Sequence, residues 1–412
     1  MKQRVVITGM GAVTPVGIGV ETFFDNLIKG VCGVGPITRF DTRDYKVKLA
    51  AEVKDFDPEA AGIDRAQAKR SDLFAQYAMA AAMQAVSDSG IEGNVAPERF
   101  GVYVGSGIGG MQTFVQETEK LLNRGPGRVS PFFVPMMIGN MAAGNIAIQF
   151  GAQGPSLPVV TACATSSHAI GEAYRAIRFG YADAVIAGGA EATVIPLAVA
   201  GFANMKALSE SEDPAAASLP FDARRGGFVI GEGSGIVVLE EYEHALARGA
   251  KIYAEVCGYG NTCDAYHITA PHPEATGAAN AFRLALQEAG WQGEKLYINA
   301  HGTGTAMNDK GETQAIKRAL GEEAARAALV SSTKSMTGHM LGAAGAAEAV
   351  VSVLALKEGI APPTIGLTSP DPDCDLDYVP LVARKADFDA SVSVSLGFGG
   401  HNACLAFRKI GG

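Results

Sequence analysis

The sequence PVVTACATSSHAIGEAYRAIRFG at residues 158–180 predicts a short apolar strand, a sharp turn of small residues and then an amphipathic helix. The same order returns at residues 330–359, in VSSTKSMTGHMLGAAGAAEAVVSVLALKEG. Two copies of one strand–turn–helix unit indicate an internal duplication. Each copy is therefore expected to belong to one of two halves that share the same element order.

Strands and helices alternate on both sides of these two units. Strands are predicted within residues 4–11, 98–110, 183–192, 251–260 and 296–305, helices within residues 21–30, 75–90, 276–290 and 312–321, and hairpins at residues 227–243 and 392–409. Such alternation indicates an α/β fold with mixed sheets covered by helices. No Pro-, Gly- or Ser-rich linker divides the chain. We therefore expect one compact unit with an N-terminal half, residues 1–250, and a C-terminal half, residues 251–412, whose two sheets pack together.

Composition narrows the class of protein. The 412 residues are 48% hydrophobic and 19% charged, which supplies a buried core and argues against disorder. The formal net charge of −9 does not suit a general nucleic-acid binder. Gly and Pro interrupt the apolar runs before they could span a membrane or form a secretion signal, and the six cysteines show no paired metal spacing. We expect a soluble cytoplasmic protein with reduced cysteines.

The longest stretch without an acidic residue, Lys or Arg runs from Val129 to Gly171. It is too long and too apolar to be surface throughout. We predict that much of it forms a homodimer interface.

Cys163 lies where the first apolar strand gives way to its helix. The unpaired N–H groups and the partial positive charge at a helix start favour a thiolate, and they could stabilise an oxyanion formed on an attacked carbonyl group. A small buried cysteine that only fills the core is the competing interpretation.

His301 and His339 occupy comparable places in the second half. His301 follows a predicted strand in NAHGTGTAMND, and His339 lies beyond Lys334 in SSTKSMTGHMLGAAG. Each histidine alone could be structural, but with Cys163 they form a set at equivalent ends of repeated elements. Such a set could hold an acyl group as a thioester and stabilise the enolate left by decarboxylation of a malonyl thioester, with Lys334 supplying positive charge.

Two other chemistries fit single features of the sequence. RVVITGMGAVTPVG begins like a dinucleotide-binding fingerprint, but Pro15 falls where the phosphate-binding helix should be under way, so we reject a dehydrogenase. Cys163, His301 and His339 could instead bind zinc. Lys334 disfavours a dication there, and elemental analysis of the purified protein decides between the two interpretations.

Four motifs in this order extend the argument over nearly the whole chain: TACATSSHAIG, NAHGTGTAMND, SSTKSMTGHMLGAAGAAE and SLGFGGHN. With them the chain resembles the β-ketoacyl-[acyl-carrier-protein] synthases of the thiolase superfamily, and among these the elongating enzymes of bacterial type II fatty-acid synthesis. The resemblance implies a thiolase-like, internally duplicated fold of five layers, αβαβα. It also implies decarboxylative Claisen condensation without an organic cofactor, with acyl- and malonyl-loaded carrier proteins as partners.

The resemblance implies a role for each matching residue. Cys163 would be the acylated nucleophile, His301 and His339 would promote decarboxylation and condensation, and Lys334 would orient and polarise that network. The other implied positions are acidic support at Glu312 and Asp264, an oxyanion hole from the N–H groups of Cys163 and Phe398, a gate at Phe398, pantetheine contacts at Thr303 and Thr305, and acyl-pocket walls at Ile108 and Phe202.

Two further sites are implied. Some relatives bind a structural monovalent cation, and the matching positions are Asn299, Glu348, Ser393 and Val394. Val394 stands where Asn is frequent, so only its carbonyl oxygen could serve. An acidic carrier protein needs basic docking residues, for which the candidates are Arg65, Lys69, Arg70 and Lys206. Plain buried polar packing and an ordinary solvated helix face are the alternatives.

Neighbouring functions remain open. A ketosynthase of a type II polyketide pathway carries the same chemistry, and a non-catalytic synthase-like partner subunit shares the fold but lacks the nucleophile. Because Cys163 and both histidines are present, an active enzyme is favoured. His401, in GFGGHN where many relatives have GFGGTN, has no assigned role.

Overall fold

The computed structural model describes residues 2–411, and its main strands form one continuous sheet path. In chain order these strands are β1 (Val5–Thr14), β5 (Phe100–Gly105), β6 (Ala184–Glu191), β7 (Gly233–Glu241), β8 (Ala254–Cys263), β9 (Leu296–Asn299), β10 (Leu329–Ser331), β13 (Ala390–Gly397) and β14 (His401–Arg408). Along the path they run β10-β9-β13-β14-β8-β1-β7-β6-β5. The antiparallel pair β1–β8 joins the two halves, so the two expected sheets are hydrogen-bonded to each other at one edge.

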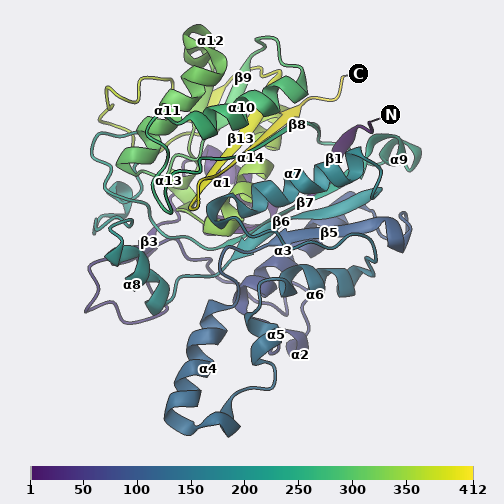
Figure 1. Cartoon of the computed structure of the whole chain (residues 1–412), viewed down its shortest axis with the longest axis vertical. Helices are drawn as coiled ribbons and strands as arrows, with labels where there is room; N and C mark the ends of the chain where they lie inside the picture. The colour runs from purple at the N-terminus through teal and green to yellow at the C-terminus, as the bar shows by residue number, and fades with distance from the viewer. Residues whose placement is uncertain (1, 412) are drawn as a thin grey trace.

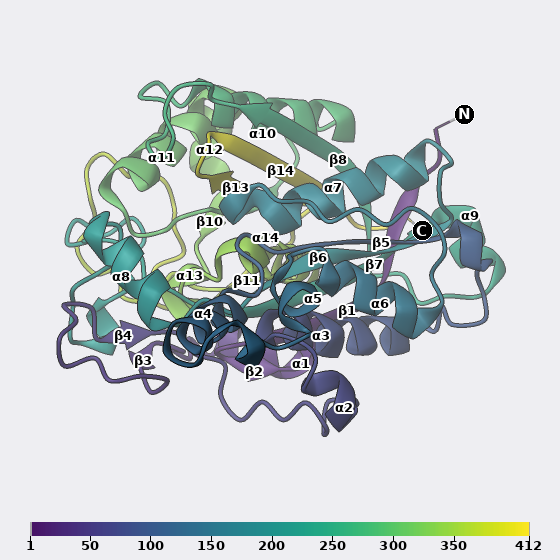
Figure 2. The ribbon, with the colours of Figure 1, turned by 60° about the horizontal axis from the view of Figure 1, so that its bottom comes forward.

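Helices lie outside and between the two halves of this path, which gives five layers (Figure 2). α3 (Leu73–Ser89) covers the outer face of the N-terminal strands, and α10 (Thr276–Ala289) covers the outer face of the C-terminal strands. α7 (Thr165–Arg178) and α14 (Ala344–Glu358) lie together between the halves. α14 is buried along nearly its whole length, as a helix packed on both sides must be. The expected αβαβα fold is confirmed.

The order of the strands is equivalent in the two halves, as a duplication predicts. In the C-terminal half β9 lies between β10 and β13, and in the N-terminal half β5 lies between β6 and the extended residues 155–157. That segment pairs with β5 through two backbone bonds, Val102 N–H to Pro155 O at 2.9 Å and Leu157 N–H to Val102 O at 3.0 Å. The strand predicted just before Cys163 is wrong, because the bridge of Ser156 to Val102 lies before it and the chain leaves the sheet edge without strand pairing at residues 158–161.

The prediction of a hairpin at residues 227–243 is wrong. Only β7 is a strand there, and it pairs with β6 on one side and β1 on the other. The counterpart of the β13–β14 hairpin in the N-terminal half is the pair β6–β7, whose two strands are separated by a long insertion at residues 192–232. The expected hairpin at residues 392–409 is confirmed by β13 and β14.

Two glycines in the first strand of each half allow a helix to lie directly on the sheet. A Cβ atom would lie within about 2 Å of a helix carbonyl oxygen at each position: Gly9 against Ala85 (2.1 Å), Gly11 against Ala81 (1.9 Å), Gly258 against Ala285 (2.0 Å) and Gly260 against Ala281 (1.9 Å). The glycines that imitate a dinucleotide fingerprint therefore serve the contact of β1 with α3, and β8 repeats the device with α10.

The remaining elements complete the surface (Figure 1). The helices are α1 (Val20–Ile28), α2 (Arg65–Ala68), α4 (Met111–Arg124), α5 (Phe133–Met137), α6 (Met141–Phe150), α8 (Pro196–Asn204), α9 (Tyr242–Ala247), α11 (Ala306–Leu320), α12 (Glu322–Ala327) and α13 (Lys334–Thr337), and the short strands are β2 (Gly17–Ile18), β3 (Gly35–Pro36), β4 (Leu49–Ala50), β11 (Ile360–Ala361) and β12 (Arg384–Lys385). α4 projects from the body of the molecule. Within residues 2–411, no helix combines the length and hydropathy that a bilayer crossing requires.

Candidate active site

A cavity of about 230 Å³ lies beyond the carboxyl ends of the parallel strands β9 and β13. Residues from both halves of the chain form its wall. The predicted site residues on this wall are Cys163, Phe202, Lys206, Asp264, His301, Thr303, Thr305, Glu312, His339 and Phe398. The cavity therefore brings together the cysteine of the first half and the two histidines of the second.

Cys163 is the middle residue of a 3₁₀ turn, η3 (Ala162–Ala164), that leads into α7. Ala162 has a φ of +52°, in the left-handed region that a residue with a side chain rarely adopts. Leu341, with a φ of +47°, begins the equivalent turn η5 (Leu341–Ala343) in front of α14. The same strained backbone thus presents Cys163 in one half and Gly342 in the other.

Burial raises the pKa of the Cys163 thiol to about 12, although the charge of Lys334 and the N–H groups of Phe398 and of Cys163 itself act in the opposite direction. The N–H groups at the helix start favour the thiolate, in the expected direction, but desolvation outweighs them. The N–H groups that act on the sulfur are the two that were named for the oxyanion hole.

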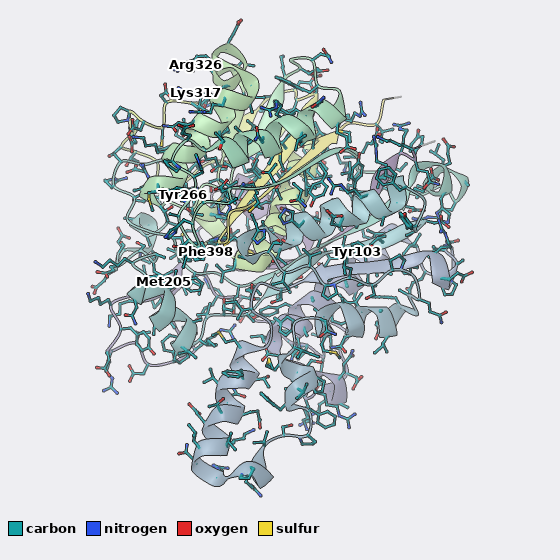
Figure 3. All side chains as sticks on the ribbon, viewed as in Figure 1. Tyr103, Met205, Tyr266, Lys317, Arg326 and Phe398 are labelled. Atoms are coloured by element: carbon teal, nitrogen blue, oxygen red, sulfur yellow. The ribbon has the colours of Figure 1, made fainter. Side chains whose placement is uncertain are left out.

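Phe398, the predicted gate residue, stands in the turn between β13 and β14, on the side of the molecule where Met205 and Tyr266 also lie (Figure 3). Gly399 and Gly400 follow it with φ of +84° and +78°. A Cβ atom on Gly397 would lie 2.7 Å from the carbonyl oxygen of Thr161 and 3.3 Å from the backbone nitrogen of Cys163. Only glycine lets this turn rest on the nucleophile turn.

His301 and His339 form a pair deep in the cavity. Their ring centroids are 5.2 Å apart, and the planes are inclined at 85°. Burial lowers the pKa of both imidazoles well below the ordinary value, and the charge of Lys334 lowers each further. Nδ1 of each ring is buried without a hydrogen-bond partner among the described residues. Both rings are therefore neutral at pH 7.

Lys334 begins α13 and is almost fully buried. Its ammonium group forms an ion pair with the equally buried Glu348 of α14. Burial raises the pKa of Glu348 to about 7, while the lysine acts to lower it. The cation that acts on Cys163 and on both histidines is thus held in place by a carboxylate.

The carboxylates of Glu312 and Asp264 accept hydrogen bonds from backbone N–H groups. Neither carboxylate is hydrogen-bonded to an imidazole of the histidine pair. Glu312 accepts the N–H groups of His301 (2.6 Å) and Gly302 (2.7 Å), and burial raises its pKa to about 7. Asp264 accepts hydrogen bonds from Nδ2 of Asn402 at 2.8 Å and from the N–H group of His272 at 3.0 Å. Glu312 therefore fixes the strand end that carries His301, and Asp264 fixes the base of the gate turn.

The predicted substrate contacts divide into two groups. Thr303 and Thr305 share a hydrogen bond of 3.0 Å and line the cavity, and Phe202 meets the ring of Phe228 edge-on at 5.6 Å. Ile108 is 41% exposed and is not among the residues that line the cavity of the single chain.

The predicted cation ligands include three buried oxygen atoms without a hydrogen-bond partner in the described chain: Asn299 Oδ1, Glu348 Oε2 and Ser393 Oγ. Asn299 and Ser393 face each other in the register of β9 and β13. Unpaired buried oxygens are costly, and oxygen ligands are what a hard cation requires. The donor set therefore fits the implied ion.

The basic residues proposed for docking are not one cluster in the single chain. Arg65, Lys69 and Arg70 are exposed at α2, and the guanidinium group of Arg70 lies 4.8 Å from the ring centroid of Phe132. Lys206 lies at the cavity beside α8, away from α2 (Figure 1).

Sequence reasoning missed three residues of this region. Phe228 meets His339 edge-on at 5.2 Å, and Leu341 lines the cavity between His339 and α14. Glu191 ends the apolar strand β6 and is fully buried close to the nucleophile turn. A carboxylate at the end of an otherwise apolar strand was the available signal for the last of these.

Comparison with known proteins agrees with this geometry. Residues 2–245 match the family described as Beta-ketoacyl synthase, N-terminal domain, and residues 253–368 match Beta-ketoacyl synthase, C-terminal domain. The chain belongs to the β-ketoacyl synthase family. It is 53% identical to 3-oxoacyl-[acyl-carrier-protein] synthase 2 of Synechocystis sp. and 52% identical to that of Staphylococcus aureus, with 99% of this chain and 98% of the relative covered in each case.

Solved structures of this family share the fold. The ishigamide ketosynthase/chain length factor has a TM-score of 0.93 at 38% identity and covers 100% of both chains. A β-ketoacyl synthase from Burkholderia phymatum has a TM-score of 0.92 at 37% identity, covering 99% of this chain and 100% of its own. A type II PKS ketosynthase bound to the hexaketide, in complex with its acyl-carrier protein, has a TM-score of 0.90 at 34% identity over 100% of both chains. The resemblance seen in the sequence is confirmed.

Proposed function

We propose that the protein is a 3-oxoacyl-[acyl-carrier-protein] synthase that elongates fatty-acid chains by decarboxylative Claisen condensation. The observation that carries the proposal is the single cavity in which Cys163 faces two neutral histidines. A core-filling cysteine would not share a cavity with two imidazoles that lack partners. The close similarity to two 3-oxoacyl-[acyl-carrier-protein] synthases favours the fatty-acid pathway over the polyketide alternative.

In the first step the acyl group moves from its carrier to Cys163. Because burial raises the pKa of the thiol, the proton leaves the sulfur as it attacks the thioester carbonyl and passes to the departing carrier sulfur. The N–H groups of Cys163 and Phe398 stabilise the oxyanion, and the carrier leaves as a free thiol. The acyl chain then rests beside Phe202.

In the second step malonyl carrier protein enters past Phe398, with its pantetheine arm against Thr303 and Thr305. The bond to the malonyl carboxylate breaks, CO₂ leaves, and the electron pair forms an enolate on the thioester. His301 and His339 stabilise the enolate oxygen by donating N–H groups, which a neutral imidazole can do with its proton on Nε2.

In the third step the enolate carbon attacks the acyl carbonyl on Cys163. The tetrahedral oxyanion collapses, the new carbon–carbon bond remains and the cysteine sulfur leaves, taking up a proton. The product is the 3-oxoacyl carrier protein. No organic cofactor is required, because the substrate thioester itself accepts the electron pair.

The partners and the quaternary structure are part of the proposal. Arg65, Lys69, Arg70 and Lys206 dock the acidic carrier. Apolar side chains of the 129–171 segment are exposed in the single chain, among them Val134, Ile148 and Val160, which supports a homodimer interface there. A homodimer in which the docking residues of one subunit serve the cavity of the other accounts for the separation of α2 from Lys206.

The proposal also covers a cation site, the boundary between the halves, the acyl pocket and the compartment. Asn299, Glu348, Ser393 and the carbonyl group of Val394 hold a structural monovalent cation that neutralises their buried oxygens. The halves divide at residues 250 and 251. Ile108 joins the acyl-pocket wall, and the cytoplasm stays the predicted compartment.

The test is a condensation assay with purified protein, malonyl carrier protein and a series of acyl carrier proteins. Formation of 3-oxoacyl products from saturated acyl chains supports the proposal. Iterative formation of polyketides from malonyl carrier alone would instead support the polyketide alternative. Absence of any condensation with both donors contradicts an active synthase and favours the non-catalytic subunit.

A further inference from the structure

The carboxylate of Glu191 is the meeting point of four hydrogen-bond donors. Ser106 Oγ donates to Oε1 at 2.8 Å and the Ile108 N–H group donates to the same oxygen at 3.3 Å. The N–H groups of Gly107 (2.9 Å) and Gly342 (3.0 Å) donate to Oε2. Glu191 is fully buried and belongs to none of the residues that line the cavity, so it does not touch a substrate there. It acts through the groups that it holds and through its charge, which contributes to raising the pKa of the Cys163 thiol.

The four donors come from two segments that border the site. Ser106, Gly107 and Ile108 form the turn after β5. Gly342 is the middle residue of η5, between His339 and α14. A Cβ atom on Gly107 would lie 2.6 Å from Glu191 Oε2, and one on Gly342 would lie 2.4 Å from the backbone nitrogen of Gly107. The backbones of Gly107 and Gly342 and the carboxylate of Glu191 are thus in close contact, with no space for a side chain at either glycine.

The duplication explains why a carboxylate stands there. Glu191 is the last residue of β6, and Gly397 is the last residue of β13, its counterpart in the other half. Beside Gly397 the nucleophile turn keeps its N–H groups available to the cavity. At the equivalent turn beside Glu191, the N–H group of Gly342 is already taken by the side-chain carboxylate. The turn η3 thus keeps the N–H group of Cys163 available for an anion in the cavity. In the equivalent turn η5 of the C-terminal half, the carboxylate of Glu191 from the N-terminal half occupies the corresponding place.

We propose that Glu191 is a positioning residue of the condensation, fixing η5 and the turn at Ile108 and thereby the place of the His339 imidazole relative to Cys163. The inference rests on the proposed function and adds to it a residue outside the cavity. His339 stands three positions before Gly342 along the chain, and Leu341 between them lines the cavity. A displacement of about 1 Å at reacting groups can cost about 10²-fold in rate.

The test separates the half-reactions in Glu191→Ala and Glu191→Gln. Acylation of the enzyme is followed by intact mass, and CO₂ release from malonyl carrier protein is followed without an acyl donor. We expect kcat for decarboxylation to fall about 10²-fold in Glu191→Ala, with the KM for malonyl carrier little changed. Glu191→Gln keeps the shape and can still accept from Gly107 and Gly342. It should therefore recover about tenfold of that loss, leaving about a tenfold deficit.

A matched control is Glu240→Ala. Glu240 is also a fully buried carboxylate, bonded to His244 Nδ1 at 2.6 Å and to Arg248 Nε at 2.7 Å, and it lines no part of the cavity. The Glu240→Ala variant should have a lower melting temperature, but its kcat for decarboxylation should change by no more than about threefold. Equal loss of kcat in Glu191→Ala and in Glu240→Ala overturns the positioning role, as does equal loss in the Ala and Gln variants of Glu191.

Two further outcomes keep the inference separate from the proposed function. If Glu191→Ala does not fold, Glu191→Gln alone decides, and a wild-type kcat in that variant overturns the inference. Wild-type enzyme is assayed first. Absence of condensation in the wild type contradicts the proposed function, whereas an active wild type with an equally active Glu191→Ala contradicts only the role of Glu191.

Discussion

The imidazoles of His301 and His339 meet edge to face at a centroid distance of 5.2 Å, although each belongs to a different turn of the C-terminal half. Lys334 acts on both imidazoles, because its charge lowers the pKa of each ring in addition to the effect of burial. This relationship yields a pair of neutral donors in a site that also holds a buried ammonium group. The following experiments test it and the groups around it.

Cys163→Ser should lose the acyl-enzyme and the condensation, because a serine hydroxyl is a much weaker nucleophile than a cysteine sulfur and gives up its proton less readily. Intact mass after incubation with acyl carrier protein measures the acyl adduct. Cys263→Ser is the control, since Cys263 is an exposed thiol outside the cavity wall. An adduct that persists in Cys163→Ser and disappears in Cys263→Ser places the nucleophile elsewhere.

His301→Ala should still acylate Cys163 but lose decarboxylation by about 10²–10³-fold, the usual effect of removing one donor to a developing oxyanion. Release of CO₂ from malonyl carrier protein is the measurement. His244→Ala, which changes a histidine bonded to Glu240 outside the cavity, should behave as wild type. Wild-type decarboxylation in His301→Ala contradicts the assigned role.

Gly397→Ala should weaken both half-reactions, because the new Cβ atom would press on the backbone of Thr161 and Cys163 at 2.7 and 3.3 Å and displace the N–H groups proposed for the oxyanion hole. We expect about a tenfold or greater loss of acylation rate. Gly35→Ala is the control, since nothing lies within 4 Å of the Cβ atom that it would add. Acylation at the wild-type rate in Gly397→Ala rules out this contact as a constraint.

Acid should destabilise the protein through its buried neutral histidines. Since burial depresses the pKa of His301 in the folded state, the unfolded chain binds more protons below the ordinary pKa of about 6.5. Stability due to this group is therefore present above that pH and falls by up to about 1.4 kcal/mol per pH unit below it. Denaturant unfolding of wild type and His301→Gln between pH 7 and pH 5 measures the difference. Parallel pH dependence of the two proteins contradicts the assignment.

A monovalent cation should raise the melting temperature, because folding buries the oxygens of Asn299, Glu348 and Ser393 without a hydrogen-bond partner and a bound cation would compensate them. Potassium and sodium chloride are compared with choline chloride at equal ionic strength. Asn299→Leu should remove the difference between the salts. The same melting temperature in all three salts for the wild type shows that the oxygens hold no such ion.

Particular elements show how far the sequence predicted the fold. The two turn–helix units and the terminal hairpin followed from apolar periodicity and glycine placement, which are local properties. The hairpin at residues 227–243 failed because two adjacent apolar runs look alike whether they pair with each other or with distant strands. In the structure Ile230 bridges to His339, and β7 pairs with β6 across a long insertion. Pairing between segments far apart in the chain leaves no local mark.

The site divides in the same way. Cys163, His301 and His339 stood out because reactive residues followed predicted strands, and their motifs carried the family resemblance. The sequence predicted that the helix start favours a thiolate at Cys163, but it did not predict the burial that raises the pKa of this thiol, since a helix start is visible in a sequence and the degree of desolvation is not. The supporting groups Phe228 and Glu191 were missed for the same reason: their role depends on which atoms the fold brings against them.

The amino-acid sequence by itself determined that this chain is a duplicated α/β protein, and it singled out one cysteine and two histidines at the ends of predicted strands. Tertiary structure alone decided that β1 and β8 join the halves, that one cavity receives residues from both, and that Glu191 accepts the N–H group of Gly342 in the turn equivalent to that of Cys163. The physical reason is that secondary structure and reactive groups are properties of neighbouring residues. Burial, pKa and mutual distance are set by contacts between residues that are distant in the chain.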